Sequence, residues 1–175
     1  MTSLLHEQKE DVLDKPSNTS DNTVLVNKLN GWLLQLSDAL NAQQVNSVAD
    51  LFESDGYWRD LLTLTWNIYT AEGRQAIVDM LQRTNLSRVI PIEFKLTDAS
   101  IDDSGVIFGL FEFSSKLGTG HGAVRLRNNL CWTFMCSMES LHGYEEPMNY
   151  NRWKGTVHKV NKITNNHMQV YEIVA

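Results

Sequence analysis

The spacing of apolar residues changes from helical to extended along this chain. From Val24, apolar side chains recur at steps of three and four, which places them on one face of an amphipathic helix: Leu25, Leu29, Trp32, Leu33, Leu36 and Leu40. This helix is expected to end near residues 41–44. A short second helix is expected over residues 45–52, before Ser54-Asp55-Gly56, and a third opens after Glu72-Gly73.

Beyond Pro91 the period of the pattern drops to two. Ile92, Phe94 and Leu96 alternate with polar residues, which predicts a long strand. Turn chemistry at residues 102–105 separates it from a second strand over 106–115, and further strands are expected over 123–127 and 130–138. Helices followed by such an antiparallel meander predict an α+β fold, with the three helices packed on one face of a curved antiparallel sheet.

A glycine-rich stretch interrupts the meander at residues 117–122. Gly118, Gly120 and Gly122 have the spacing G-x-G-x-G, which is reminiscent of a phosphate-binding loop. Such a loop must open a helix, because the helix N-terminus supplies amides to the phosphate. Here an extended segment follows, so we expect a bend of the sheet, or the close approach of a ligand to the backbone.

The chain of 175 residues suits one domain with tails. Residues 1–22 are polar and aperiodic and predict a disordered arm, residues 23–146 form the domain, and residues 147–175 form a tail or truncated linker. The N-terminus lacks the apolar core of a secretory signal, and no apolar run is long enough for a membrane span. We therefore expect a cytoplasmic protein.

Composition narrows the classes of partner. A net charge of −6 argues against nucleic acid, which needs clustered Lys and Arg. Cys131 and Cys136 lie five residues apart on one predicted strand, too far apart and on opposite faces, so we expect reduced core thiols. No Cys or His spacing indicates zinc, and we expect no metal.

The candidate chemistry centres on residues 57–66, which combine two indoles, a guanidinium and a carboxylate with apolar and hydroxyl side chains. Asp60 in such surroundings is expected to lose water, and dehydration raises the pKa of a carboxyl group. A carboxylate of this kind can serve as a general base or anchor a polar ligand. The alternative, slightly favoured by this run alone, is a partly buried ion pair between Arg59 and Asp60 that only satisfies itself.

The order of helices, the motif Tyr57-Trp58-Arg59-Asp60 and the meander resemble the nuclear transport factor 2-like superfold. This cone is shared by ketosteroid isomerase, scytalone dehydratase and SnoaL-like polyketide cyclases. The closer resemblance, over residues 25–146, is to the N-terminal accessory domain of flavin-containing monooxygenase-like proteins. It rests on residues 58–62, Thr65-Trp66, Gly73, residues 118–126, Trp132-Thr133 and residues 141–146.

The chain departs from that family after residue 146. The family continues into a Rossmann-type module with a glycine-rich FAD fingerprint, whereas no G-x-G-x-x-G follows residues 170–175 here. We therefore expect no FAD, NADPH or other cofactor. The chain is interpreted as a truncated or separated accessory domain, or as a stand-alone descendant.

The resemblance implies an acid or base among aromatic side chains at the open end of the cone. Asp60 is the first candidate, with Arg59 as its orienting partner and His121 as a second titrating group. Tyr57, Trp58, Trp66 and Trp132 would supply apolar walls, and Glu112 would join them if it faces inward. The alternatives are a loop histidine without a role, outward-facing Glu112 and Glu139, and aromatic residues that belong to the core.

Three functions remain open, in decreasing order of preference. The first is a non-catalytic accessory or dimerisation domain. The second is a small cofactor-free lyase or isomerase that acts on a hydrophobic carbonyl compound through Asp60. The third is a module that binds a hydrophobic small molecule or a protein. Apolar residues on both faces of strands 106–115 and 130–138 also predict a homodimer through the open face of the sheet.

Overall fold

The computed structural model describes residues 19–145, in which three α-helices and a 3₁₀-helix cover a six-stranded sheet. The helices are α1 (Thr19–Asn41), α2 (Val45–Asp50), α3 (Gly73–Arg83) and the short η1 (Leu86–Arg88). The strands are β1 (Phe52–Leu61), β2 (Ile68–Glu72), β3 (Ile92–Ile101), β4 (Ile107–Ser115), β5 (Gly118–Arg127) and β6 (Leu130–Leu141). Helix α1 begins a few residues before the expected domain boundary at 22, whereas the expected tail at 147–175 lies outside the described residues.

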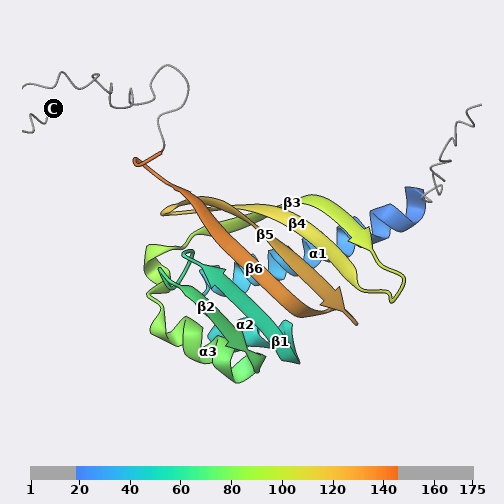
Figure 1. The fold of residues 1–175 in the computed structure, drawn as a ribbon, viewed down its shortest axis with the longest axis horizontal. Helices are drawn as coiled ribbons and strands as arrows, with labels where there is room; N and C mark the ends of the chain where they lie inside the picture. Colours follow the sequence, from blue (N-terminus) through green and yellow to red (C-terminus); the bar gives the residue numbers. More distant parts are fainter. Residues whose placement is uncertain (1–18, 146–175) are drawn as a thin grey trace, which may run out of the picture. The chain divides into compact units, whose positions relative to one another are not determined.

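The sheet is mixed, which corrects the expectation of a purely antiparallel one. Its strand order is β2-β1-β6-β5-β4-β3, and β6 runs parallel to β1 while all other neighbours are antiparallel. The four-strand meander from β3 to β6 brings its last strand alongside β1 (Figure 1). Apolar spacing alone does not encode the relative direction of two strands so far apart in sequence.

The helices pack on one face of this sheet. Helix α1 lies behind the meander and packs mainly on β3, and α3 packs on β1 and β2 (Figure 1). The apolar face predicted for α1 is confirmed, because its key side chains are buried: Leu29, Trp32, Leu33, Leu36 and Leu40. The expected second helix ends at Asp50, and Phe52 and the predicted stop Ser54-Asp55-Gly56 belong to β1 instead.

Aromatic rings fill the space between the helices and the sheet. Phe134 on β6 is central: its ring stacks on Phe111 at 5.1 Å and meets Trp58 edge to face at 4.8 Å. Trp32 of α1 closes over the same ring at 5.7 Å. Burial of these rings is the main apolar contribution to stability, and it leaves the interior of the domain packed with side chains.

The glycine-rich stretch lies within β5, where the register against β6 shifts between Thr119 and Gly120, in keeping with the expected bend of the sheet. A Cβ atom at Gly122 would lie 2.3 Å from the Phe111 ring, and one at Gly120 would lie 2.5 Å from the Phe113 ring. The glycines therefore make room for phenylalanine rings of the neighbouring strand β4. No ligand is needed to explain their spacing.

Both cysteines are free and buried in the core, as expected, but they do not point to opposite faces of the sheet. Strand β6 shifts register against β5 and β1 around residues 131–133, which offsets the simple alternation of faces. Burial raises the pKa of both thiols, with a smaller contribution from Glu53 at Cys131 and from Asp60 at Cys136. Among the described residues, no helix is long and apolar enough to cross a membrane.

Candidate functional site

Strand β1 places Arg59 and Asp60 on opposite faces of the sheet. Trp58 and Asp60 point into the core and are almost fully buried, whereas Tyr57 and Arg59 point outward. The Arg59 guanidinium donates a long hydrogen bond to the Thr70 hydroxyl at 3.4 Å. The predicted ion pair between Arg59 and Asp60 is therefore wrong, because neighbouring residues of a strand cannot turn their side chains toward the same side.

The Asp60 carboxylate organises the β1–β2 loop, residues 62–67. It accepts hydrogen bonds from the Leu64 amide at 3.0 Å, the Thr65 amide at 2.8 Å and the Thr65 hydroxyl at 2.6 Å. The Cys136 thiol donates a weaker one at 3.5 Å. Hydrogen bonds to a charged acceptor are stronger than neutral ones, so the buried charge is compensated by the loop that it holds.

The β1–β2 loop adopts a backbone conformation that side chains disfavour. Leu62 and Trp66 have φ angles of 66° and 56°, in the left-handed region. Bulky residues rarely occupy this region, which costs roughly 1–3 kcal/mol per residue and persists only where the surroundings enforce it. The result of this strain is that the Trp66 side chain stands 51% exposed instead of packing in the core.

Trp66 forms part of the wall of a hollow of about 340 Å³, called the Trp66 hollow below. Residues 64–67 and Tyr69 form one side, and Met80, residues 83–85, Arg88 and Val89 form the other. The charged residues of this lining are Arg83, at the end of α3, and Arg88, in η1. Among the described residues, no Asp, Glu, His or Cys lines it, and Asp60 is screened from it by its own loop.

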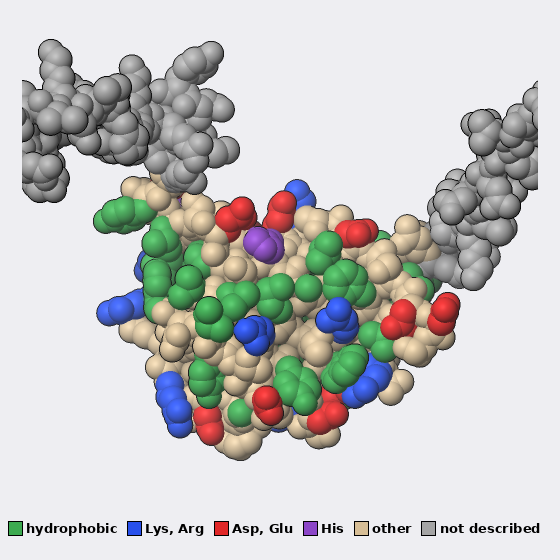
Figure 2. Space-filling view, in the orientation of Figure 1, with side chains coloured by type: hydrophobic (Ala, Val, Ile, Leu, Met, Phe, Trp, Pro, Cys, Tyr) green, Lys and Arg blue, Asp and Glu red, His purple; other side chains and the backbone are tan. Residues whose placement is uncertain are grey.

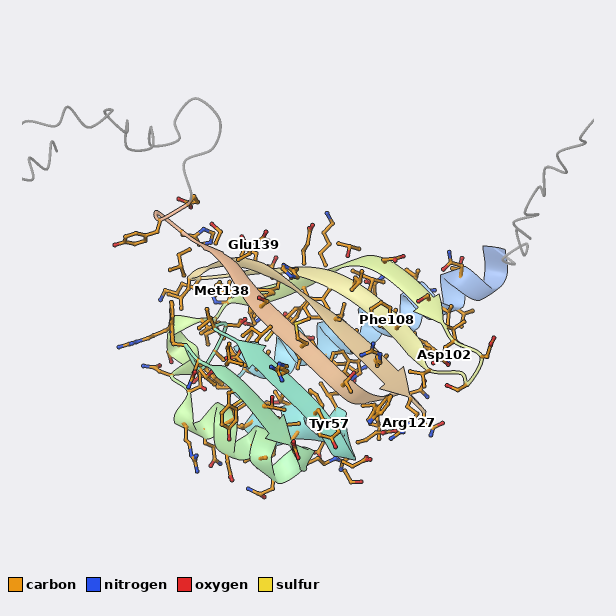
Figure 3. All side chains as sticks on the ribbon, viewed as in Figure 1. Tyr57, Asp102, Phe108, Arg127, Met138 and Glu139 are labelled. Atoms are coloured by element: carbon orange, nitrogen blue, oxygen red, sulfur yellow. The ribbon has the colours of Figure 1, made fainter. Side chains whose placement is uncertain are left out.

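The other predicted pocket residues lie elsewhere. Trp58 belongs to the core, and Trp132 lies under the Arg127 guanidinium, whose centre is 4.8 Å from the ring. Tyr57 and Arg127 stand on the open side of the sheet (Figure 3). The residues of the predicted aromatic pocket therefore lie in separate parts of the domain. Of them, only Trp66 lines the Trp66 hollow.

His121 and Glu112 are neighbours on the outer face of the sheet. They pair across β4 and β5, and the His121 Nδ1 atom lies 3.5 Å from a carboxylate oxygen of Glu139, labelled in Figure 3. A second hollow, of about 510 Å³ and called the acidic hollow below, contains Glu93, Lys95, Glu112 and Glu139 in its lining. Glu112 thus faces outward, and His121 and Asp60 do not share a site. No group of three or more potential ligands is arranged for a metal ion within residues 19–145.

Sequence reasoning missed Arg83, Arg88 and Tyr69. The two arginines follow the last apolar residues of α3 and look like an ordinary solvated helix end. Their proximity to Trp66 depends on how the β1–β2 loop folds over the end of α3. The sequence feature that could have pointed to this site is the pair Arg83 and Arg88, five residues apart. It is a weak indication.

No protein family matches the sequence, and no curated protein matches it significantly. Solved structures do share its fold. A domain of unknown function with a cystatin-like fold from Nostoc punctiforme superimposes with a TM-score of 0.55 at 11% identity, over 71% of this chain and 80% of that one. A protein of unknown function from Mycobacterium tuberculosis gives a TM-score of 0.52 at 16% identity, over 71% and 78%.

The orange carotenoid protein of Anabaena, which binds canthaxanthin, gives a TM-score of 0.49 at 14% identity. That match covers 62% of this chain but only 35% of the carotenoid protein. Other neighbours are described as nuclear transport factor 2-like and ketosteroid isomerase-like folds. The two matches with TM-scores above 0.5, one of them described as cystatin-like, show the fold alone at these identities. No comparison supports the resemblance to flavin monooxygenases.

Proposed function

We propose that this domain binds a small, flat, largely apolar molecule in the Trp66 hollow, without catalysing its conversion. The observation that carries the proposal is the exposed Trp66 side chain, held over a hollow by a strained loop. Hydrogen bonds that the buried Asp60 carboxylate accepts from Leu64 and Thr65 maintain that loop. Strain of this kind is typical of ligand clamps, because a relaxed loop would place the indole elsewhere.

The size of the hollow suits a ligand of two or three fused rings. Its volume of about 340 Å³ lies near the lower end of the range of roughly 300–1,000 Å³ that small-molecule sites occupy. Trp66 and Tyr69 offer ring faces, and Met80 and Val89 offer apolar contact at the base. At about −0.3 kcal/mol per non-hydrogen atom, a ligand the size of 2-naphthoate, with about 13 such atoms, would bind with a Kd on the order of 1 mM.

Binding is favoured over catalysis by what lines the hollow. A lyase or isomerase needs a group that takes or gives a proton within about 3 Å of the substrate. Asp60, the predicted base, is fully buried, and its oxygens accept hydrogen bonds from its own loop. A substrate in the Trp66 hollow would have to displace residues 64–65 before it reached the carboxylate. The lyase or isomerase is therefore the less favoured alternative.

The accessory-domain function expected from the sequence is not part of this proposal. It rested on the resemblance to flavin monooxygenase-like proteins. What supports the binding function instead is a feature of this chain itself, the placement of Trp66 by Asp60.

Titration calorimetry with 2-naphthoate tests the proposal. Wild-type protein is compared with Trp66→Ala, which removes the stacking surface, and with Trp132→Ala, which removes an indole far from the hollow. Loss of one aromatic stacking partner is worth roughly 0.5–1.5 kcal/mol beyond its buried area, so Trp66→Ala should weaken binding about tenfold. Equal weakening by both variants, or no binding to wild-type protein, would contradict the proposed function.

A further inference from the structure

We infer that the ligand of the Trp66 hollow is an organic anion whose carboxylate is held by Arg83 and Arg88. This inference rests on the proposed function and adds the chemical class of the ligand. Both arginines belong to the lining, and within residues 19–145 no acidic residue lines the hollow to neutralise them. The two positive charges therefore remain available to a molecule that enters.

The lack of partners distinguishes these two arginines from the others. Among residues 19–145 neither Arg83 nor Arg88 forms an ion pair or a side-chain hydrogen bond. Every other arginine of that part of the chain has a partner: Arg59 with Thr70, Arg74 with the Phe52 carbonyl, Arg125 with Thr133, and Arg127 with Glu53. The two arginines without partners are thus the two that line the hollow beside Trp66.

The charge of the hollow is opposite in sign to that of the whole chain, whose net charge is −6. The Trp66 hollow has two arginines and no acid, which gives +2. The acidic hollow has three glutamates and one lysine, which gives −2. An anion is repelled by most of this surface, so a local pair of cations decides where it can bind.

The geometry of α3 explains why two guanidiniums are needed. Arg83 lies in the last turn of α3, where the negative end of the helix dipole favours a cation and opposes an anion. The helix end would therefore repel a carboxylate if the arginines were absent. A guanidinium can donate two parallel hydrogen bonds to a carboxylate, and a second one supplies the charge that outweighs the dipole.

The ligand that this arrangement fits has an aromatic body and one carboxylate at its edge. The body would lie against Trp66 and Tyr69, and the carboxylate would face Arg83 and Arg88. The Asn85 side-chain amide, which also lines the hollow, can donate to the same group. Neutral molecules of the same shape would keep the ring contacts and lose the charged ones.

The matched pair 2-naphthoate and 2-naphthamide tests the inference by calorimetry at low salt. The two probes have the same shape, and only the first is charged. We expect wild-type protein to bind 2-naphthoate about tenfold more tightly, since hydrogen bonds to a charged group are roughly twice as strong as neutral ones. Arg83→Gln and Arg88→Gln should each remove most of this preference and leave 2-naphthamide unaffected. Arg59→Gln is the control, with the same change in charge on the opposite face of the sheet.

The outcomes separate this inference from the proposed function. Equal affinity of wild-type protein for the two probes would overturn the inference that the ligand is an anion. The hollow would then remain a proposed site for neutral ligands. Binding of neither probe would overturn both. Equal weakening of 2-naphthoate binding by Arg59→Gln would show that overall charge, and not the arginine pair, selects the anion, and would also overturn the inference.

Discussion

Asp60 and Thr65 are joined by two hydrogen bonds, because the Asp60 carboxylate accepts both the amide and the hydroxyl of Thr65, at 2.8 and 2.6 Å. This contact links a fully buried residue of β1 to the residue that precedes Trp66. It therefore couples a charge in the core to the position of an exposed indole at the surface. Asp60 therefore holds the loop that carries Trp66, whichever ligand the hollow binds.

Replacing Asp60 with Asn should destabilise the domain. An amide keeps one oxygen but turns an N–H₂ group toward the Leu64 and Thr65 donors, so at least one buried donor loses its acceptor. The expected loss is about 1–3 kcal/mol in the free energy of unfolding, measured by denaturant melts. Trp66 fluorescence should shift at the same time, because the loop is no longer held.

Asp103→Asn is the matched control for Asp60→Asn. Asp103 lies in the exposed turn between β3 and β4, and its replacement makes the same change in charge. Its unfolding free energy should stay within about 0.5 kcal/mol of wild type, as for most surface substitutions. A melt of Asp60→Asn that matches this control would show that the carboxylate does not support the loop.

Alanine substitutions at two glycines should have opposite effects. At Gly122 the new Cβ atom would meet the Phe111 ring at 2.3 Å and the Met135 carbonyl oxygen at 2.2 Å. The ring is stacked on Phe134 and cannot move freely, so Gly122→Ala should cost roughly 1–3 kcal/mol of stability. At Gly31, within α1, nothing lies within 4 Å, and Gly31→Ala should stabilise by roughly 0.5–1 kcal/mol. Thermal melts of both variants measure these changes in stability. A Gly122→Ala variant as stable as wild type would contradict the packing described for β5.

Much of the fold follows from sequence periodicity. The face of α1, the start of α3 and the strands after Pro91 could all be predicted, because burial imposes a period of 3.6 or 2 on apolar residues. The parallel pairing of β1 with β6 could not, since it depends on contacts between segments far apart in sequence. The packing role of the β5 glycines could not be predicted either, because their neighbours, the rings of Phe111 and Phe113, are known only once the strands are paired.

Both thiols should be unreactive in the folded protein. Burial is the main cause that raises the pKa of Cys131 and Cys136, whose ordinary value is 9.0. The folded state therefore keeps protons that the unfolded state releases, and stability should decline as pH rises above about 9. Titration with a thiol-specific disulfide reagent at pH 8 should show reaction only after denaturant is added. Rapid reaction of either thiol without denaturant would place it at the surface.

We propose that the outer face of the sheet forms a homodimer. Hydrophobic side chains lie across the middle of this face with basic side chains among them, and acidic side chains lie toward its margins (Figure 2). Leu110 is 39% exposed there, and Phe108 and Met135 are partly exposed beside it. Leu110→Asp should reduce the molar mass measured by light scattering to that of one chain. Leu34→Asp, on the exposed side of α1, should leave it unchanged, and a wild-type monomer at roughly 50 µM would count against the dimer.

The candidate site could be predicted only in part. The sequence indicated Asp60 and Trp66, because a carboxylate and indoles in an apolar run are unusual. It could not show that Asp60 acts through the loop, that Arg59 faces the other side, or that Arg83 and Arg88 meet Trp66. These relations depend on a left-handed turn at Leu62 and Trp66, for which neither residue type has a preference.

Two-dimensional NMR of the indole N–H groups, during a titration with 2-naphthoate, tests most directly whether the Trp66 hollow binds a ligand. The chain contains five tryptophans, and the Trp66 signal can be assigned by its absence in Trp66→Phe. We expect a saturable shift of the Trp66 signal, while the signals of the buried Trp32 and Trp58 stay in place. A Trp66 signal that does not move up to about 10 mM ligand, or a larger saturable shift at Trp132, would contradict it.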